Sequence, residues 1–351
     1  MVPKSPVGAL RPLRVLVVIP TLNEAFHIEG VLAALGATPS PARVPGAEFV
    51  RYVVVDGGSS DGTVRIVERW AGRDARVQLL HNAARLQSAA INLAVEQCGA
   101  GLDILVRCDA HATYPEGFIA ALLRSMRAVG ADSVVVPMDS EGRSNFQRAV
   151  AWVSNSPIGT GGSAHRAGHR SGFVDHGHHA AMKLDMFRRA GGYDATMSHN
   201  EDAELDCRIR ALGGRIYLDA DIRLTYLPRA NWRALCRQYF NYGRGRSRTM
   251  RRHPSSARLR QLLVPAHFVA LLGSLAVVPF AGWIALAYPA VYATGVSATA
   301  VRIALRERAL AGLLAAPVAA AMHQSWAAGF LFGLLTVRER RWCVEQPASA
   351  G

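Results

Sequence analysis

The sequence predicts an α/β protein built on a parallel sheet and followed by C-terminal membrane helices. Three apolar runs end abruptly in polar, acidic or Gly-rich residues, at positions 15–24, 52–63 and 104–111. Such runs are typical of strands that are buried on both faces of a parallel sheet. Two later stretches, 261–301 and 309–337, carry no formally charged residue. Each of these is long enough for at least one helix that crosses a bilayer, which takes about 20 apolar residues.

Apolar runs alternate with helix-like segments through the first 140 residues, and this alternation predicts a parallel sheet with right-handed crossovers. Strands are expected near 14–20, 50–55, 77–81, 103–107 and 133–137, and helices near 24–36, 62–71, 86–98 and 116–129. Residues 138–182 are rich in Gly, Ser and His and predict a long functional loop region, with one helix near 145–153. A helix from about 201 to 212 follows, with Asn200 as its N-cap.

Three carboxylates follow the predicted strands: Glu24, Asp56 and Asp109. Ligands of open α/β sheets bind beyond the carboxyl ends of the strands, so these side chains are expected at one rim. An acidic rim suits a ligand that combines a metal ion with a diphosphate. Asp56 precedes a Gly-Gly turn and can accept hydrogen bonds from a nucleobase or a ribose, or it can simply stabilise the turn.

Four motifs in register resemble the family 2 glycosyltransferases of the GT-A fold, over roughly residues 14–250. They are PTLNE at 20–24, DGGSSDGT at 56–63, Asp109-Ala-His111 and Asn200-Glu201-Asp202. Segments 107–112 and 237–243 are most similar to the exopolysaccharide glucosyltransferases of the succinoglycan type. The resemblance implies inverting transfer of a hexose, expected to be glucose from UDP-glucose, to a lipid-linked or polysaccharide-precursor acceptor.

The resemblance also implies roles for single residues in donor binding. Pro20, Thr21, Glu24 and Asp56 correspond to positions that hold the nucleotide. Arg85 can reach the same nucleotide as a cation, or it is an ordinary solvated arginine.

Asp109 and His111 are the expected ligands of Mn²⁺ or Mg²⁺, because Mg²⁺ is usually held by one or two carboxylates together with substrate phosphates. His111 stands where the family has a second acid and favours Mn²⁺. Alternatively, His111 packs under the acceptor loop.

The Glu201-Asp202 pair corresponds to the position of the catalytic base, with Asp202 taking the proton of the attacking hydroxyl. The alternative is that acids in a first helical turn only complement the helix dipole. Glu204 and Asp206 are expected to face solvent or to pair with Arg208 and Arg210.

Two further residues, Arg237 and Gln238, are expected to cap the active site. The processive synthases of the family carry Gln-x-x-Arg-Trp at this position, and this sequence does not. The chain therefore resembles an enzyme that adds a single sugar.

The segment 162–179 gathers five histidines, at positions 165, 169, 176, 178 and 179, and two arginines, at 166 and 170. Three interpretations are open. The segment lines the acceptor mouth, holds a structural zinc, or is a solvated loop. No cysteine lies nearby, which disfavours zinc.

The formal net charge is +14, and residues 229–260 contain ten arginines and no acid. A basic cluster beside an apolar span typically contacts anionic lipid, so membrane is favoured over nucleic acid as its partner. Residues 262–279 and 282–301 predict a helical hairpin with Pro279–Gly282 as its turn. The run 309–337 is left open as a third crossing, a re-entrant or interfacial segment, or a buried helix. The arginine bias places the catalytic domain on the cytoplasmic side of the cell membrane.

The expected organisation is an N-terminal tail (1–13), a GT-A domain (14–228), a basic interfacial segment (229–260), membrane-associated helices (261–337) and a C-terminal tail (338–351). Five widely spaced cysteines predict no disulfide framework, with Cys98 and Cys108 in the core. Two other functions are weighed. A sugar-phosphate nucleotidyltransferase would need a basic Gly-rich loop near the N-terminus, where this chain has Glu24. A non-catalytic membrane scaffold would not need Asp56, Asp109 and Asp202 together.

Overall fold

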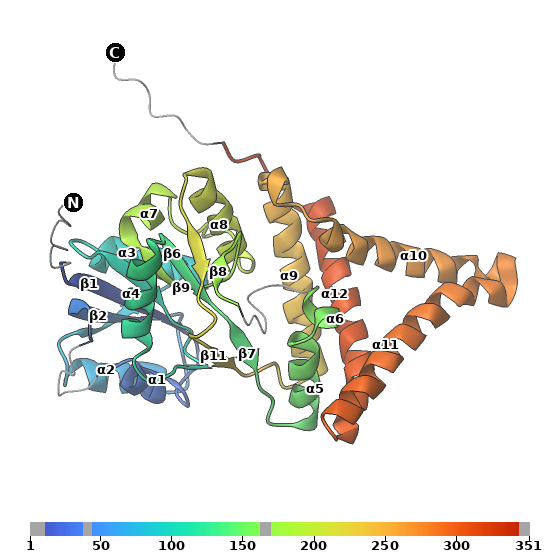
Figure 1. Cartoon of the computed structure of the whole chain (residues 1–351), viewed down its shortest axis with the longest axis horizontal. Coiled ribbons are helices and arrows are strands. Elements are labelled where there is room, and N and C mark those ends of the chain that lie inside the picture. Colours follow the sequence, from blue (N-terminus) through green and yellow to red (C-terminus); the bar gives the residue numbers. More distant parts are fainter. Residues whose placement is uncertain (1–10, 38–43, 162–169, 344–351) are drawn as a thin grey trace, which may run out of the picture. The chain divides into compact units, whose positions relative to one another are not determined.

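The computed structural model describes residues 11–37, 44–161 and 170–343. The chain divides into two compact units (Figure 1). Unit 1 comprises Met1–Val134 and His179–Gly191, and unit 2 comprises Val135–His178 and Gly192–Gly351. Each unit is described by itself.

Unit 1 is built on a sheet with the strand order β3-β2-β1-β4-β9. β1, β2, β3 and β4 are mutually parallel, and β9 runs antiparallel to β4. The strands are β1 (Leu13–Thr21), β2 (Ala47–Asp56), β3 (Val77–His81), β4 (Ile104–Arg107) and β9 (His178–Lys183). The parallel sheet predicted from the apolar runs is therefore confirmed, with strands at each of the first four predicted positions.

Helices connect these strands in unit 1. They are α1 (Ile28–Ala34), α2 (Thr63–Ala71), α3 (Gln87–Cys98), α4 (Phe118–Val129) and α7 (Leu184–Arg189). The two-residue strand β5 (Ala112–Thr113) follows β4, and β6 (Ser133–Val136) lies at the boundary of the units. Leu16, Ile19, Tyr52 and Leu105 are fully buried in the sheet. Burial of such side chains contributes about 25 cal/mol per Å² of apolar surface. Cys98 and Cys108 are buried and free, as predicted.

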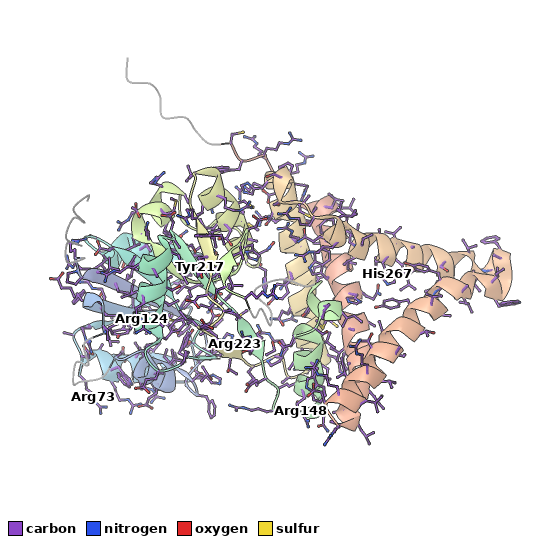
Figure 2. All side chains as sticks on the ribbon, viewed as in Figure 1. Arg73, Arg124, Arg148, Tyr217, Arg223 and His267 are labelled. Atoms are coloured by element: carbon purple, nitrogen blue, oxygen red, sulfur yellow. The ribbon has the colours of Figure 1, made fainter. Side chains whose placement is uncertain are left out.

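Unit 2 combines short strands with long helices. Its strands are β7 (Met138–Ser140), β8 (Gly172–Phe173), β10 (Ile216–Leu218) and β11 (Leu224–Tyr226). Its helices are α5 (Asn145–Ser154), α6 (Pro157–Thr160), α8 (Glu201–Ala211), α9 (Trp232–Arg252), α10 (Leu259–Ala281), α11 (Ala287–Arg306) and α12 (Ala315–Thr336), with 3₁₀ helices at Pro254–Ser256, Gly282–Leu286 and Leu310–Leu314. β10 pairs antiparallel with β8, and β11 pairs parallel with β7. Tyr217 of β10 and Arg223, the residue before β11, are labelled in Figure 2.

The region 138–182 is more regular than the predicted loop. α5 (Asn145–Ser154) matches the helix predicted near 145–153 to within one residue, and Ser144 and Gln147 form a capping box at its start. The strands β7, β8 and β9 were not predicted. Each is short or begins in a polar stretch, so none leaves an apolar run in the sequence.

α10 and α11 form a bend at the 3₁₀ helix Gly282–Leu286 (Figure 1). Gly282 has φ +63°, which a residue with a side chain rarely adopts. His267 of α10 (Figure 2) hydrogen-bonds the hydroxyl of Tyr288 on α11 at 2.8 Å. Two stretches, Leu259–Arg306 and Leu310–Thr336, are long and apolar enough to cross a membrane by length and composition. In the most apolar window of the first stretch no residue is buried, whereas 39% of the second window is buried.

α9 and α12 run side by side (Figure 1) and approach each other through glycines. A Cβ atom added to Gly243 of α9 would lie 1.9 Å from the carbonyl oxygen of Trp326 on α12. A Cβ added to Gly329 of α12 would lie 1.9 Å from the carbonyl oxygen of Phe240 on α9. Neither glycine can therefore be replaced while the two backbones stay at this distance. α12 is thus a helix with one side covered by protein.

Candidate active site

The predicted nucleotide-binding residues of unit 1 meet at the carboxyl ends of β1 and β2. The register pairs Thr21 with Asp56, and Pro20 is the residue before Thr21 in β1. The Thr21 hydroxyl donates to Asp56 Oδ1 at 3.4 Å, and the Gly57 N–H donates to the Thr21 carbonyl at 2.8 Å. The parallel sheet therefore brings two motifs that lie 35 residues apart into direct contact.

Asp56 is buried and organises the turn that follows β2. Its Oδ2 accepts hydrogen bonds from the N–H groups of Gly58 at 2.8 Å and Ser59 at 2.9 Å. The Ser59 hydroxyl also donates to Oδ1. The turn-stabilising function considered for this aspartate is thus present in the structure, while its contact with a nucleotide stays a prediction.

The loop after β1 is held by hydrogen bonds to the loop after β2. Asn23 has φ +58°, and its N–H donates to Ser59 Oγ at 2.8 Å. The Glu24 N–H donates to Thr63 Oγ1 at 2.9 Å. These bonds hold residues 23–24 out of helical geometry. The helix predicted from residue 24 therefore begins only at Ile28.

Arg85 lies over the glycine turn that follows Asp56. A Cβ added to Gly58 would lie 3.1 Å from Arg85 Nη2, and Gly58 has φ +88°. Arg85 itself has φ +56°, which costs about 1–3 kcal/mol for a residue with a side chain. Strain of this kind clusters at functional sites, and here it places a guanidinium beside the Asp56 turn.

Asp109 follows β4 and is held by groups that the sequence analysis did not identify. Gln87 Nε2 donates to Asp109 Oδ1 at 2.9 Å, and Arg107 Nη2 lies 3.2 Å from the same oxygen. The Tyr114 hydroxyl accepts from the Asp109 N–H at 2.6 Å and donates to the Asp109 carbonyl at 3.0 Å. Burial raises the pKa of Tyr114 well above its usual value of 10, so the hydroxyl stays protonated.

Glu24 and His111 form a second polar group at this edge of unit 1. His111 Nδ1 lies 3.1 Å from Glu24 Oε1, and His27 Nδ1 lies 3.0 Å from Glu24 Oε2. Burial raises the pKa of Glu24, but hydrogen bonds and charge from His111 and then His27 outweigh it and lower the pKa overall. Glu24 is therefore ionised at neutral pH and orients the His111 ring.

The residues at this edge fit a divalent cation that shares its ligands with a substrate. A carboxylate bonded to one ring nitrogen is the usual support of a metal-binding histidine, and Glu24 supplies it to His111. Among residues 11–37, 44–161 and 170–343, no three His, Cys, Asp or Glu side chains form a group that could hold a metal by themselves. Asp109 and His111 would thus bind a cation only together with diphosphate and water oxygens, as is usual for Mg²⁺.

In unit 2, the predicted base lies at the start of α8. Glu201 is buried, and the Asp202 side chain is 16% exposed with Oδ2 3.9 Å from His178 Nδ1. Asn200 is the N-cap, as predicted, but it has φ +67° and its side chain makes no capping bond. The reason is packing with α9. The backbone of Gly245 lies so close that an added Cβ would be 2.3 Å from the His199 carbonyl oxygen.

The later acids of α8, Glu204 and Asp206, are fully buried, which excludes the alternative that they face solvent. Glu204 forms an ion pair with Arg208, at 2.6 Å, as predicted. It also bonds His253 Nε2 at 2.9 Å. Asp206 bonds His176 Nδ1 at 2.8 Å, whereas its predicted partner Arg210 lies 3.4 Å from Asp175. Both contacts come from residues distant in sequence.

Arg237 and Gln238 lie on α9. The Arg237 side chain is exposed. Gln238 Nε2 donates to the hydroxyls of Tyr226 at 3.1 Å and Tyr242 at 2.9 Å. The Tyr242 ring packs edge-on against His199, three residues before Asp202, at 5.5 Å between centroids. Gln238 therefore supports the loop that precedes the candidate base.

The histidine-rich segment is described only in part. His165, Arg166 and His169 lie outside the described residues. His179 is buried, His176 and His178 contact carboxylates of α8, and Arg170 is exposed. His176 and His178 thus contact carboxylates of the protein.

Comparison with known proteins identifies the class. The sequence profile of the glycosyl transferase family 2 matches residues 16–191. The succinoglycan biosynthesis protein ExoA of Rhizobium meliloti (strain 1021) is 44% identical over 325 residues, which cover 93% of this chain and 96% of that protein. Among solved structures, the mannosyltransferase PcManGT from Pyrobaculum calidifontis, in complex with GDP-Man and Mn²⁺, superposes with a TM-score of 0.56 at 20% identity, covering 93% of this chain and 88% of that one.

The fold is therefore the α/β fold of the GT-A class, and the protein is a glycosyltransferase. The chain belongs to glycosyltransferase family 2. The nucleotidyltransferase and scaffold alternatives fall away. The four motifs that carried the resemblance led to the correct family.

Proposed function

We propose that this enzyme transfers a hexose with inversion from a nucleotide-diphosphate sugar to a lipid-linked acceptor in exopolysaccharide synthesis. The observation that carries the proposal is the edge of unit 1, where Thr21, Asp56, Arg85 and Asp109 gather beyond the strands. The 44% identical relative is a succinoglycan biosynthesis protein, which supports a succinoglycan-type exopolysaccharide as the product. UDP-glucose is the donor we favour.

The donor nucleotide binds beyond β1 and β2 in this proposal. Asp56 is held rigid by the N–H groups of Gly58 and Ser59, so its carboxylate can accept bonds from a base or a ribose at little entropic cost. Arg85, above the same turn, supplies a cation for the diphosphate. Pro20, Thr21 and Glu24 complete the proposed nucleotide site. The GDP-Man complex of the structural neighbour supports a nucleotide sugar as the ligand.

A divalent cation, Mn²⁺ or Mg²⁺, neutralises the developing charge on the departing diphosphate when bound. Asp109 and His111 would hold it in this chain. Gln87 and Tyr114 fix Asp109, and Glu24 orients His111. The Mn²⁺ of the structural neighbour supports this cofactor class.

Asp202 acts as the base in this proposal. Its carboxylate takes the proton of the attacking acceptor hydroxyl while the oxygen attacks the anomeric carbon. The bond from that carbon to the diphosphate breaks on the opposite face, which inverts the configuration. General-base catalysis of this kind contributes about 10²–10⁴-fold. Glu201 is buried beside Asp202. Gln238 or Arg237 would cap the active site.

Membrane attachment is the third part of the proposal. The α10–α11 hairpin exposes large apolar side chains along its length, among them Leu263, Phe280 and Trp283. Exposed apolar surface of this extent is unfavourable in water and fits a bilayer. The exposed arginines of residues 229–260, among them Arg229, Arg233 and Arg244, would face anionic lipid on the cytoplasmic side, where the nucleotide sugar is available. One side of α12 packs against protein, and its other side would contact lipid.

A donor screen tests the proposal. Membranes from cells that express the chain are incubated with radiolabelled nucleotide sugars, including UDP-glucose and GDP-mannose, and label is followed into the lipid extract. We expect one donor to label lipid in the presence of a divalent cation. Asp132→Asn is the matched control for Asp109→Asn, because Asp132 pairs with Lys183 at 2.9 Å beside the first residues of β4 and β6, away from the carboxyl ends of the parallel strands. That control should label lipid normally. Label that stays water-soluble with every donor would refute the lipid-linked acceptor.

A further inference from the structure

α9 presents two faces to different parts of unit 2. One face carries Gly245, Thr249 and His253, which contact the loop before α8 and α8 itself. Thr249 Oγ1 lies 3.4 Å from Asn200 Oδ1, and His253 bonds Glu204 at 2.9 Å. The spacing of four residues places these groups on one side of the helix. This face therefore fixes both sides of the Glu201-Asp202 pair.

The other face of α9 is packed on α12 and the segment that follows it. A Cβ added to Gly333 would lie 2.4 Å from Ser247 Oγ. Arg251 donates to the carbonyl of Gly333 at 2.8 Å and to that of Val337. The N–H of Trp342 donates to the Arg252 carbonyl at 3.0 Å. The end of α12 and residues 337–342 are thus bound along the last two turns of α9.

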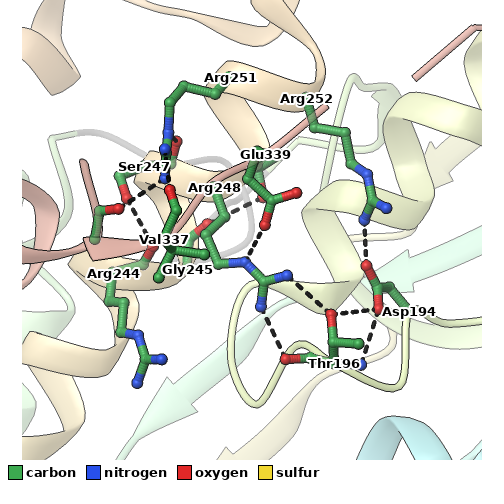
Figure 3. A network of polar contacts seen from close by, with 12 residues as sticks. Asp194, Thr196, Arg244, Gly245, Ser247, Arg248, Arg251, Arg252, Val337 and Glu339 are labelled. Atoms are coloured by element: carbon green, nitrogen blue, oxygen red, sulfur yellow. Dashed lines mark hydrogen bonds and ion pairs between the residues drawn. The ribbon is translucent and has the colours of Figure 1, made fainter. Parts of the chain in front are cut away.

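Arg248 is the residue that touches both sides (Figure 3). Its Nε donates to Glu339, and its two terminal nitrogens donate to the carbonyl and the hydroxyl of Thr196, each at 2.8 Å. Glu339 is 6% exposed and Arg248 is 13% exposed, so the pair is largely shielded from water. A shielded pair that loses one partner is costly, because the remaining charge is left buried.

The Thr196 loop is stiffened from a second side by Asp194. Asp194 Oδ1 accepts from the N–H of Thr196 at 2.8 Å and from its hydroxyl at 2.7 Å, and Oδ2 accepts from Arg252. The contacts form a continuous series from Arg252 through Asp194, Thr196 and Arg248 to Glu339 (Figure 3). Thr196 lies six residues before Asp202, in the loop that leads into α8.

We propose that Arg248 is a positioning residue for Asp202: by tying Thr196 to Glu339, it makes the geometry of the Glu201-Asp202 pair depend on the docked segment after α12. The inference rests on the proposed function in one respect, the assignment of Asp202 as the base. Arg248 acts through the loop 194–200 and does not touch substrate.

The test compares Arg248→Ala, Glu339→Gln and Arg215→Ala in detergent-purified full-length protein. Arg215→Ala is the matched control, since it also removes a guanidinium of unit 2, one that lies over the Phe173 ring at 4.1 Å. With the donor found by the lipid-labelling screen, we expect Arg248→Ala to lower kcat on the order of 10–100-fold, because misplacement of a catalytic group by about 1 Å costs such factors. The donor KM should change less than about twofold, since unit 1 is unaltered.

Hydrogen–deuterium exchange supplies a readout that does not involve the base. In Arg248→Ala and Glu339→Gln, amides of residues 194–204 should exchange about tenfold faster, while the strands of unit 1 keep the wild-type rate. The control should match wild type in both measurements. If Arg248→Ala unfolds, Glu339→Gln, which keeps the size of its side chain, decides the question alone. Wild-type exchange at 194–204 would overturn the proposal. Faster exchange with unchanged kcat would overturn it as well. An inactive Arg248→Ala beside a fully active Asp202→Asn would instead disprove the base assignment.

Discussion

Replacement of either glycine between α9 and α12 by alanine should destabilise unit 2. An added Cβ would lie 1.9 Å from a carbonyl oxygen at Gly243 and at Gly329, whereas ordinary contacts of a Cβ atom are 3.4 Å or more. The helices must then separate by more than 1 Å along the contact. Overpacking of this kind costs about 1–3 kcal/mol and occasionally more. For a unit of about 200 residues this lowers the apparent Tm by roughly 2–12 °C, at 2–4 °C per kcal/mol.

The control for this prediction is Gly273→Ala on α10. Nothing lies within 4 Å of a Cβ added there, so the substitution changes helix propensity alone, by up to about 1 kcal/mol in the stabilising direction. The assay is loss of the monodisperse peak in size-exclusion chromatography after heating in detergent. The reasoning is refuted if Gly243→Ala and Gly329→Ala are as heat-resistant as Gly273→Ala.

Four further outcomes are expected. Asp109→Asn should abolish divalent-dependent transfer while the circular dichroism spectrum is kept, and near-normal turnover with Mn²⁺ or Mg²⁺ would disprove the metal assignment. Asp202→Asn should lose turnover but still bind the donor, and a defect confined to donor affinity would contradict its function as a base. Burial raises the pKa of Asp194, but hydrogen bonds from its threonine and arginine partners outweigh burial and lower this pKa to about 2. The stability that the carboxylate contributes is therefore complete above about pH 4 and is lost as the pH falls through 2. The free energy of unfolding should differ between wild type and Asp194→Asn by about 1–2 kcal/mol at pH 7 after solvent screening, and this difference should shrink from pH 4 toward pH 2. Full-length protein should resist extraction by high salt without detergent, whereas a chain that lacks residues 261–351 should be released as salt screens the exposed arginines of 229–260. Release of the full-length protein by salt alone would disprove the hairpin insertion.

The sheet and its acidic edge could be predicted because each buried strand leaves a local signal. Residues 15–19, 52–55 and 104–106 are apolar, and each run is followed at once by polar residues, so both the strand and its end are visible in sequence. The hairpin 262–301 could be predicted for a similar reason, because a stretch of this length without a charged residue is typical of helices that cross a membrane. Each of the three strand signals spans at most five residues, and each of the two apolar runs of the hairpin spans about 20.

What could not be predicted depends on contacts between distant segments. Asn200 was expected to cap α8 with its side chain, but the close backbone of Gly245 imposes a left-handed conformation. Glu204 is buried because His253, 49 residues away, meets it. Tyr114 clamps Asp109, yet a lone tyrosine after a short loop resembles any core aromatic. The location of residues 309–337 could not be predicted, because an apolar sequence does not show whether its side chains contact lipid or a neighbouring helix.

Because α9 contacts both the loop before α8 and the segment after α12, it affects the order in which the enzyme folds during synthesis. Thr196 finds its arginine partner 52 residues later, and that arginine finds Glu339 a further 91 residues on. A growing chain that has completed the strands of unit 1 and α8 still lacks both contacts. The loop beside Asp202 therefore gains its final partners only after the hairpin and α12 have been synthesised. In a chain made in the order of its sequence, the edge of unit 1 proposed to bind the donor is complete first, and the loop before the proposed base reaches its final geometry only after residue 339 has been synthesised.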